Sequence, residues 1–190
     1  HYARKWDLQS APSICSGCSV GCNITPGERY GSLRRVVNRY HNDINGYFLC
    51  DRGRFGAHYV NSESRLRGSK DASGLSVSTR EVEERITAFA SEAVIGIGSP
   101  RASNEANFAL RCFVGAENFF AGHSDADHEA LQVLVECLRD SSFHSPSVRE
   151  IEQADAIIVL GEDVTNTAPR IALALRQSVR NAAKDLAEAN

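Results

Sequence analysis

The sequence of 190 residues contains no methionine, a single tryptophan and only five prolines. It has no apolar run of the roughly 18 to 20 residues that a membrane-spanning helix requires. Its first residues, HYARKWDLQS, lack the apolar segment of a signal peptide, so we expect a reducing compartment. The missing initiator methionine suggests that these residues are part of a longer chain.

Charge is distributed unevenly along the chain. Residues 1–70 hold 11 Lys and Arg against 5 Asp and Glu, whereas residues 71–190 hold 10 against 19. Together with the linker-like RLRGSKDASG at residues 65–74, this break predicts two domains, over residues 1–68 and 75–190. A basic domain is typical of nucleic-acid binding. Here the arginines lie among cysteines, which favours a bound anionic group instead, and we expect no nucleic acid as partner.

The first domain is predicted to be a small antiparallel β-sheet with cysteine-bearing loops. Pro26–Gly27 is a turn signal between β-branched and aromatic residues, and HNDING at residues 41–46 is a second one. Such a domain has a modest apolar core, so a bound metal centre would help to stabilise it.

The second domain alternates short apolar runs with helical patterns, which predicts an α/β fold with a partial parallel sheet flanked by helices. Expected strands are EAVIGIG (residues 92–98), ENFF (117–120) and ADAIIVLGED (154–163). The expected helices follow Ser103 up to Gly115, cover residues 128–140 and 148–154, and run from about Ala168 to Ala187. Three strands are few for such a sheet, so we expect it to continue beyond Asn190.

Four of the six cysteines form a three-plus-one pattern: Cys15, Cys18 and Cys22 within eight residues, and Cys50 much later. Structural zinc sites usually take two pairs of ligands, whereas a [4Fe–4S] cluster needs one thiolate at each of four iron corners. The pattern therefore favours a [4Fe–4S] cluster, with structural zinc as the alternative. We expect Arg52 and Arg54 to offset its negative charge.

The other two cysteines, Cys112 and Cys137, each lie on the apolar face of a predicted helix. Free cysteine is commonly buried as a small apolar residue. We therefore expect both to be buried thiols without a ligand role.

The cysteine pattern together with NGYFLCDRGRF at residues 45–55 resembles the iron–sulfur domain of the molybdopterin oxidoreductase superfamily. APSICSGCSVGCNITPGERYGSLRRVVNRY, VIGIGSPRAS and ADAIIVLGEDVTNTAPRIALALRQ further resemble the G-subunit family of bacterial NADH–quinone oxidoreductases, the respiratory complex I. The resemblance implies that Cys15, Cys18, Cys22 and Cys50 bind a [4Fe–4S] centre away from the main electron path. The clusters on that path would precede His1.

Superfamily enzymes carry a Lys or Arg two residues after the fourth cysteine, between cluster and pterin, and Arg52 fills that position. Arg52 alone thus does not exclude molybdopterin. The loop after the expected strand at residues 154–163 is more informative, since Glu162 and Asp163 stand where a pyrophosphate would require positive charge or hydrogen-bond donors. We therefore expect a retained scaffold with no molybdopterin.

The resemblance implies an electron-transfer module in the peripheral arm of complex I, which couples NADH oxidation to quinone reduction and ion translocation. The remaining proteins of that arm would be its partners, with no direct membrane insertion. Its location would be cytoplasmic, on the inner face of the plasma membrane. No acid–base or nucleophilic group accompanies the cysteines, so we expect no catalytic residue. This chain alone should therefore show no catalytic turnover. The alternatives are a molybdopterin-dependent oxidoreductase, of the formate dehydrogenase or nitrate reductase type, and a zinc-binding interaction module.

Overall fold

The computed structural model describes residues 3–89, 94–100 and 102–189. The chain forms two compact units: one combines His1–Arg65 with Ser145–Asn190, and the other is Leu66–His144. The break near residue 65 lies close to the expected linker, whereas residues 145–190 group with the first unit. The predicted domains, 1–68 and 75–190, remain a prediction.

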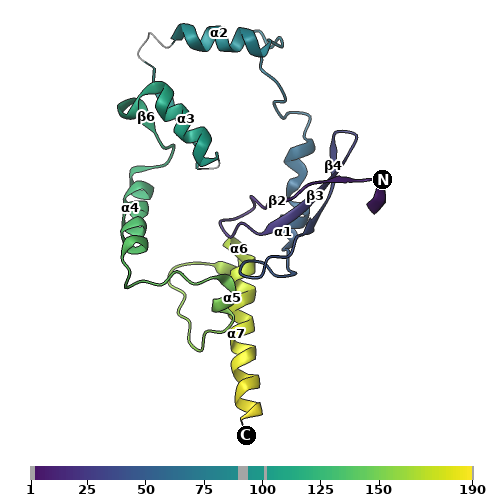
Figure 1. Ribbon diagram of the computed structural model, residues 1–190, viewed down its shortest axis with the longest axis vertical. Coiled ribbons are helices and arrows are strands. Elements are labelled where there is room, and N and C mark those ends of the chain that lie inside the picture. The colour runs from purple at the N-terminus through teal and green to yellow at the C-terminus, as the bar shows by residue number, and fades with distance from the viewer. Residues whose placement is uncertain (1–2, 90–93, 101, 190) are drawn as a thin grey trace. The chain divides into compact units, whose positions relative to one another are not determined.

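The first unit contains a small antiparallel sheet, which confirms that prediction (Figure 1). Its central strand, β3, pairs with β4 from Ile24 to Arg29 on one side and with the short β1 and β2 on the other. The strands are β1 (Gln9–Ser10), β2 (Ser13–Ile14), β3 (Asn23–Arg29) and β4 (Ser32–Asn38).

The predicted turn at Pro26–Gly27 is wrong, because both residues lie inside β3. The chain reverses instead at Tyr30 and Gly31, which both have positive φ. The β3–β4 register shifts between Gly27 and Glu28, next to the proline. Proline is tolerated in strands at such irregularities, so pairing in the sheet overrides the local turn signal. The second predicted turn, at residues 41–46, is present and is closed by a bridge between His41 and Gly46.

The core of this unit is small and includes a candidate ligand. One cluster of buried apolar residues comprises Cys22, Ile24, Val36 and Leu49. The remaining elements of residues 3–65 are η1 (Lys5–Asp7), α1 (Asp51–Phe55) and η2 (Ala57–Asn61). Of the four members of this cluster, Cys22 is a candidate ligand and Leu49 directly precedes another, Cys50, so the cluster and the cysteines share the same space. Ala172 and Ala174 of the same unit are also buried.

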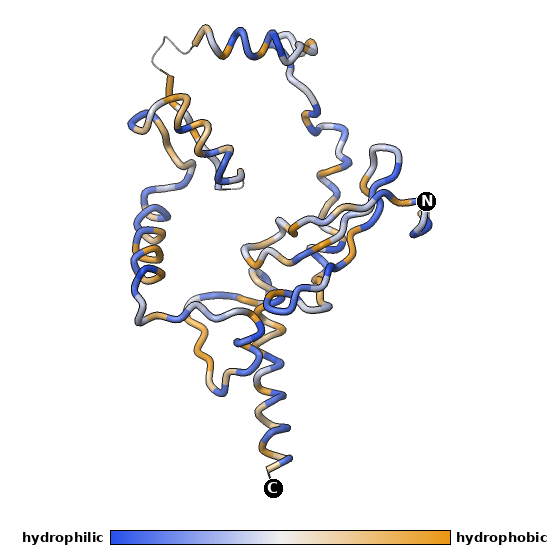
Figure 2. The backbone as a smooth tube through the Cα atoms, in the orientation of Figure 1, coloured by the Kyte–Doolittle hydropathy of each residue, from blue (hydrophilic) through white to orange (hydrophobic). Residues whose placement is uncertain are grey.

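The C-terminal part of this unit is helical: α5 (Val148–Ile151), α6 (Val164–Thr167) and α7 (Pro169–Glu188). The long helix from about Ala168 to Ala187 is thereby confirmed. The strand expected over residues 154–163 is wrong: this run is an irregular loop, drawn in orange in Figure 2, and Ile158 and Leu160 are 83% and 85% exposed. A strand needs a partner, and no strand among the described residues pairs with this run.

The second unit contains helices and one parallel pair of short strands, β5 with β6. Its elements are α2 (Thr79–Phe89), β5 (Gly96–Ile97), α3 (Asn104–Val114), η3 (Ala116–Asn118), β6 (Phe119–Phe120) and α4 (Asp125–Arg139). Part of the strand expected over residues 92–98 lies outside the described residues. The parallel pair and the flanking helices confirm the α/β fold class.

Local signals place the helices of this unit well. The Ser103 hydroxyl accepts a hydrogen bond from the Ala106 N–H and caps α3, which ends at Gly115, as predicted. The prediction of burial is less successful, because Cys112 is exposed and Cys137 only half-buried.

Within residues 3–89, 94–100 and 102–189, none of the helices combines the length and the apolar composition that crossing a bilayer requires.

Candidate metal centre

The loop with three cysteines is closed by the sheet. The β2–β3 ladder pairs Ile14 with Asn23, and directly beyond it the Cys15 N–H donates to the Cys22 carbonyl over 2.8 Å. Gly21, with a φ of 68°, adopts the left-handed conformation that lets the chain turn back into β3. The loop is thus held at both ends by backbone hydrogen bonds, which brings its first and last cysteines together.

The fourth cysteine joins this loop through a close approach at Gly53. Cys50 precedes α1 as its N-cap, and its Sγ accepts a hydrogen bond from the Gly53 N–H over 3.4 Å. A Cβ at position 53 would lie only 3.2 Å from the Cys15 Sγ and 2.6 Å from Leu49 Cδ1. The sulfurs of Cys15 and Cys50 therefore both lie close to Gly53, and only glycine leaves this space free.

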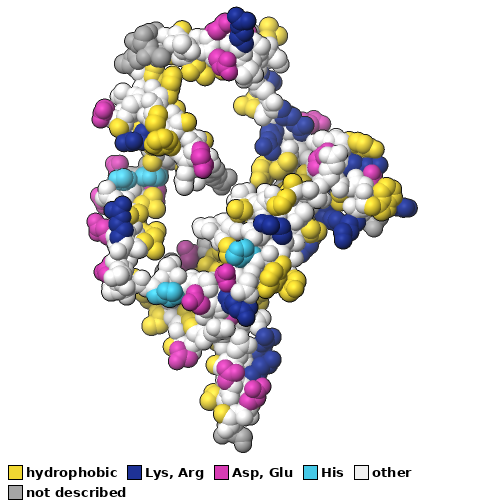
Figure 3. All heavy atoms as spheres, viewed as in Figure 1, with side chains coloured by type: hydrophobic (Ala, Val, Ile, Leu, Met, Phe, Trp, Pro, Cys, Tyr) yellow, Lys and Arg dark blue, Asp and Glu magenta, His cyan; other side chains and the backbone are white. Residues whose placement is uncertain are grey.

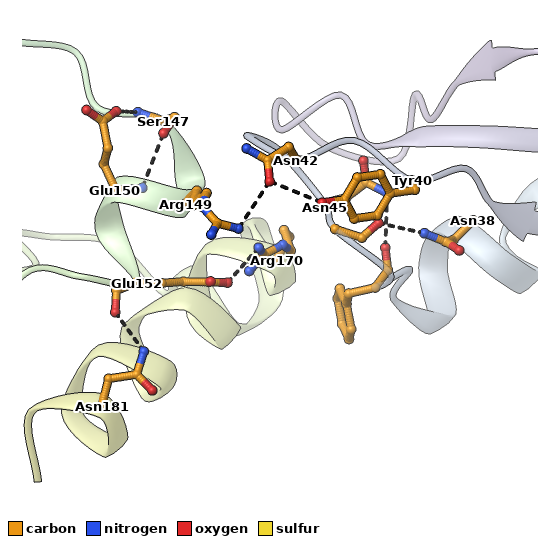
Figure 4. A network of polar contacts seen from close by, with 12 residues as sticks. Asn38, Tyr40, Asn42, Asn45, Ser147, Arg149, Glu150, Glu152, Arg170 and Asn181 are labelled. Carbon is orange, nitrogen blue, oxygen red and sulfur yellow. Dashed lines mark hydrogen bonds and ion pairs between the residues drawn. The ribbon is translucent and has the colours of Figure 1, made fainter. Parts of the chain in front are cut away.

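A buried asparagine connects the two cysteine-bearing segments. Asn45 is 1% exposed and its Oδ1 accepts from the Asn23 N–H, next to Cys22, over 3.0 Å. Its amide nitrogen donates to the Phe48 carbonyl, two residues before Cys50, over 3.3 Å. Asn45 therefore fixes the spacing between the segments (Figure 4).

Cys22 is the most buried of the four, with 5% of its surface exposed. Burial, followed by the charges of Cys18, Cys15 and Cys50, raises the pKa of the Cys22 thiol to about 11, while Arg170 acts to lower it. Without a bound cation this thiol stays protonated, and metal binding would release its proton.

The spread of these sulfurs distinguishes one ion from a larger centre. Four thiolates around a single zinc lie about 3.8 Å apart, which follows from a Zn–S bond of about 2.3 Å and tetrahedral angles. Within the described part of the chain, no three His, Cys, Asp or Glu side chains come together closely enough to hold one metal ion. The four cysteines are therefore not gathered around one position as the ligands of a single zinc ion would be.

Hydrogen bonds to sulfur also fit an iron–sulfur centre. The Gly17 N–H donates to the Cys15 Sγ and the Gly53 N–H donates to the Cys50 Sγ, both over 3.4 Å. Such bonds are one of the means by which proteins stabilise these clusters and set their potentials. The residues present therefore fit a [4Fe–4S] cluster in number and in chemistry.

Of the two predicted arginines, Arg52 lies across the cysteine loop. Its guanidinium donates to the Gly17 carbonyl over 3.4 Å and to the Asn166 carbonyl of α6. Arg54 is half-buried on the same short helix. Figure 3 shows Lys and Arg side chains, in dark blue, gathered over the sheet region. Whether Arg52 and Arg54 act on a bound cluster remains a prediction.

Two residues of the site have no counterpart among the sequence-based predictions. Asn45 lies in a turn motif, where asparagine is common for local reasons. Arg170 acts to lower the pKa of the Cys22 thiol, although 148 positions separate the two residues in the sequence. In the sequence, Arg170 directly follows Pro169 at the start of a helix, and this position gives no indication of a metal centre.

Comparisons with known proteins agree with this geometry. The family model of the molybdopterin oxidoreductase Fe4S4 domain matches residues 8–62, which include all four cysteines of the candidate site. Because the matched family is defined by an Fe4S4 domain, the predicted cofactor is confirmed for this region.

Relatives extend the match over nearly the whole chain. It is 53% identical over 99% of its length to the G subunit of NADH-quinone oxidoreductase from Salmonella typhimurium and from Escherichia coli. It is 51% identical over 99% of its length to the G subunit from Pseudomonas fluorescens. The chain covers 21% of each of these relatives, about a fifth of their length. The resemblance inferred from the sequence is therefore confirmed: this chain is similar over almost all its residues to a segment of the NADH-quinone oxidoreductase G subunit, and residues 8–62 match the Fe4S4 domain of the molybdopterin oxidoreductase family.

Proposed function

We propose that this chain is an electron-transfer module in which Cys15, Cys18, Cys22 and Cys50 hold one [4Fe–4S] cluster. The observation that carries the proposal is that the Cys15 N–H donates to the Cys22 carbonyl, and that Gly53, whose N–H donates to the Cys50 Sγ, closely approaches the Cys15 Sγ. Among the described residues, no three of these cysteine side chains come close enough together to bind a single metal ion. When bound, such a cluster accepts and releases one electron at a time.

The protein's own contribution is to hold four thiolates and to control their surroundings. The β2–β3 pair and the Asn45 side chain hold the two cysteine-bearing segments together. Backbone N–H groups of Gly17 and Gly53 donate to ligand sulfurs. Arg52 covers the loop and brings a positive charge beside it.

The names of the relatives support a wider proposal for the whole protein. We infer that it works in an NADH–quinone oxidoreductase, with the other proteins of the peripheral arm as partners, on the inner face of the plasma membrane. The activity would be NADH oxidation coupled to quinone reduction and ion translocation. This chain supplies no residues for hydride transfer or quinone chemistry in our proposal, so the purified chain should not turn over NADH and a quinone.

We also propose that no molybdopterin binds this chain. The two carboxylates behind this expectation have partners within the protein. Asp163 caps α6 by accepting from the Asn166 N–H over 3.3 Å, and Glu162 accepts from the Thr167 hydroxyl over 3.0 Å. Their negative charge opposes a pyrophosphate at this loop.

Anaerobic purification with analysis of iron, sulfide and zinc tests the proposal. We expect about four irons and four sulfides per chain, and a low-temperature EPR signal on reduction. The Cys18→Ala and Cys50→Ala variants should lose the signal, whereas Cys112→Ala, which removes an exposed thiol outside the site, should retain it. Zinc without iron or sulfide, or a signal that survives both ligand substitutions, would overturn the proposal.

A further inference from the structure

The Asn45 side chain is a buried amide with hydrogen-bond partners at both ends. The residue is 1% exposed, and its Oδ1 accepts from the Asn23 N–H over 3.0 Å. Four backbone carbonyls lie within hydrogen-bond distance of its Nδ2: those of Arg39 at 3.1 Å, of Phe48 at 3.3 Å, and of Asn23 and Gly46, both at 3.4 Å. Because buried polar groups are costly unless they are bonded, this position requires a side chain that accepts at one end and donates at the other.

These hydrogen bonds join the two segments that carry the candidate ligands. Asn23 directly follows Cys22, and Phe48 lies two residues before Cys50. All the partners of Asn45 in this network are main-chain groups, so the amide fixes the course of the backbone on both sides. The position of Cys50 relative to Cys22 therefore depends on this one side chain.

The three cysteines of residues 15–22 are held in a different way. The Cys15 N–H donates to the Cys22 carbonyl over 2.8 Å at the end of the β2–β3 ladder, a backbone bond that needs no side chain. Cys50 lies beyond the sheet, at the start of α1, and its neighbour Leu49 is held by apolar packing, which is not directional. Loss of the buried amide should therefore loosen Cys50 while the backbone bond of the other segment remains.

We propose that Asn45 is the positioning residue for the Cys50 corner of the bound cluster, and that its loss releases this ligand while the other three cysteines stay bound. The inference rests on the proposed cluster site. Each of the four iron corners takes one thiolate, so a corner whose thiolate has moved away holds its iron less firmly. On treatment with a one-electron oxidant such as ferricyanide, the [4Fe–4S]²⁺ core then gives up one electron to the oxidant and one Fe²⁺ ion to the solvent. A [3Fe–4S]⁺ core remains, and the free Cys50 thiolate takes up a proton.

An isosteric substitution in the iron-loaded chain tests this role. Asn45→Asp keeps the shape of the side chain, but a carboxyl group has at most one hydrogen to donate, and none when it is ionised. The control is Asn38→Asp, the same chemical change at a half-buried asparagine whose Nδ2 donates to the Gly46 carbonyl over 2.9 Å. With an amount of ferricyanide that leaves the wild-type cluster intact, Asn45→Asp should fall to about three irons per four sulfides and show the EPR signal of an oxidised three-iron cluster. Asn38→Asp should behave like the wild type.

Alkylation identifies the ligand that has been released. Iodoacetamide modifies a free thiolate, and mass spectrometry of peptides locates the modified cysteine. In oxidised Asn45→Asp we expect the label at Cys50 and not at the cysteines of residues 15–22. The exposed Cys112 should be labelled in every sample, which shows that the reagent has acted.

Three results would overturn the inference alone. They are a cluster in Asn45→Asp that resists oxidation as well as the wild type, a three-iron signal that is equally strong in Asn38→Asp, and a label that appears first within residues 15–22. Loss of iron and sulfide in step from both Asn45→Asp and the smaller Asn45→Ser would also overturn it, because Asn45 would then support the fold as a whole and not one ligand. A wild-type chain that binds no cluster overturns the proposed function and this inference together.

Discussion

At the scale of single residues, Gly53 carries the tightest constraint on the candidate centre. Its N–H donates to the Cys50 Sγ, and the space of a Cβ is already bounded by Leu49 and by the Cys15 Sγ. Both neighbours are fixed, since Leu49 is buried in the core and Cys15 is held by the β2–β3 hairpin. A side chain at this position therefore has to displace either the core or a candidate ligand.

We accordingly predict that Gly53→Ala weakens both the fold and the cluster. Overpacking of this kind costs about 1–3 kcal/mol. Anaerobic denaturant titration should show that loss in the free energy of unfolding, and iron analysis should show fewer irons per chain. Gly68→Ala is the matched control, because nothing lies within 4 Å of a Cβ there. Equal stability and iron content in the two variants would contradict the tight approach at Gly53.

At the scale of elements, the short helix α6 depends on one carboxylate. The Asp163 carboxylate accepts two hydrogen bonds from Asn166, one from its side-chain amide and one from its backbone N–H. Both bonds lower the pKa of Asp163 from its ordinary value of 3.8, and the side-chain bond has the larger effect. A carboxyl with a lower pKa in the folded state binds its proton more weakly there than in the unfolded state. Its capping contribution is therefore complete above pH 3.8 and is lost as the pH falls through the lower, folded pKa.

This argument predicts a titration that depends on Asn166. Followed by the carboxyl ¹³C shift in NMR, Asp163 should titrate below its ordinary value in the wild type. In Asn166→Ala, which loses the side-chain donor but retains the backbone N–H, the pKa should move partway back toward 3.8. A pKa that is identical in both proteins would show that the side-chain bond does not hold the carboxylate.

How much of the fold can be predicted from the sequence varies with how local the cause is. The cap at Ser103, the glycine stop at Gly115 and the start of α7 just after Ala168 lie within one helical turn of the ends they define, and all are predicted correctly. The apolar run at residues 154–163 favours a strand because its composition is strand-like. Strand formation depends on a partner far away in the sequence, which composition does not report.

The same distinction applies to the candidate centre. The loop from Cys15 to Cys22 can be predicted, because spacing within one loop is a local property. The close approach of Gly53, three residues after Cys50, to the Cys15 Sγ cannot be predicted, since it depends on where α1 packs. The ion pair of the buried Arg170 with Glu152 depends on how α7 packs, so no sequence pattern near the cysteines indicates it.

At the scale of the molecule, the first unit has few apolar residues with which to hold itself together. Its buried apolar cluster comprises Cys22, Ile24, Val36 and Leu49. Small cores usually need a metal, disulfides or another constraint in order to be stable. All six cysteines are free thiols, so disulfides do not supply it here. The proposed cluster is therefore expected to contribute to folding as well as to electron transfer.

Removing iron should consequently loosen the first unit and leave the second one unchanged. Hydrogen–deuterium exchange of the iron-loaded chain, before and after anaerobic chelation, measures both in one experiment. We expect faster exchange over residues 15–55, because four ligand side chains lose their common anchor and the buried Cys22 returns to a protonated thiol. Helices α3 and α4 lie in the separate unit 66–144 and provide the internal control. Unchanged protection in both units would mean that the hairpin, the Asn45 network and the small core suffice for folding, and that the cluster stabilises nothing.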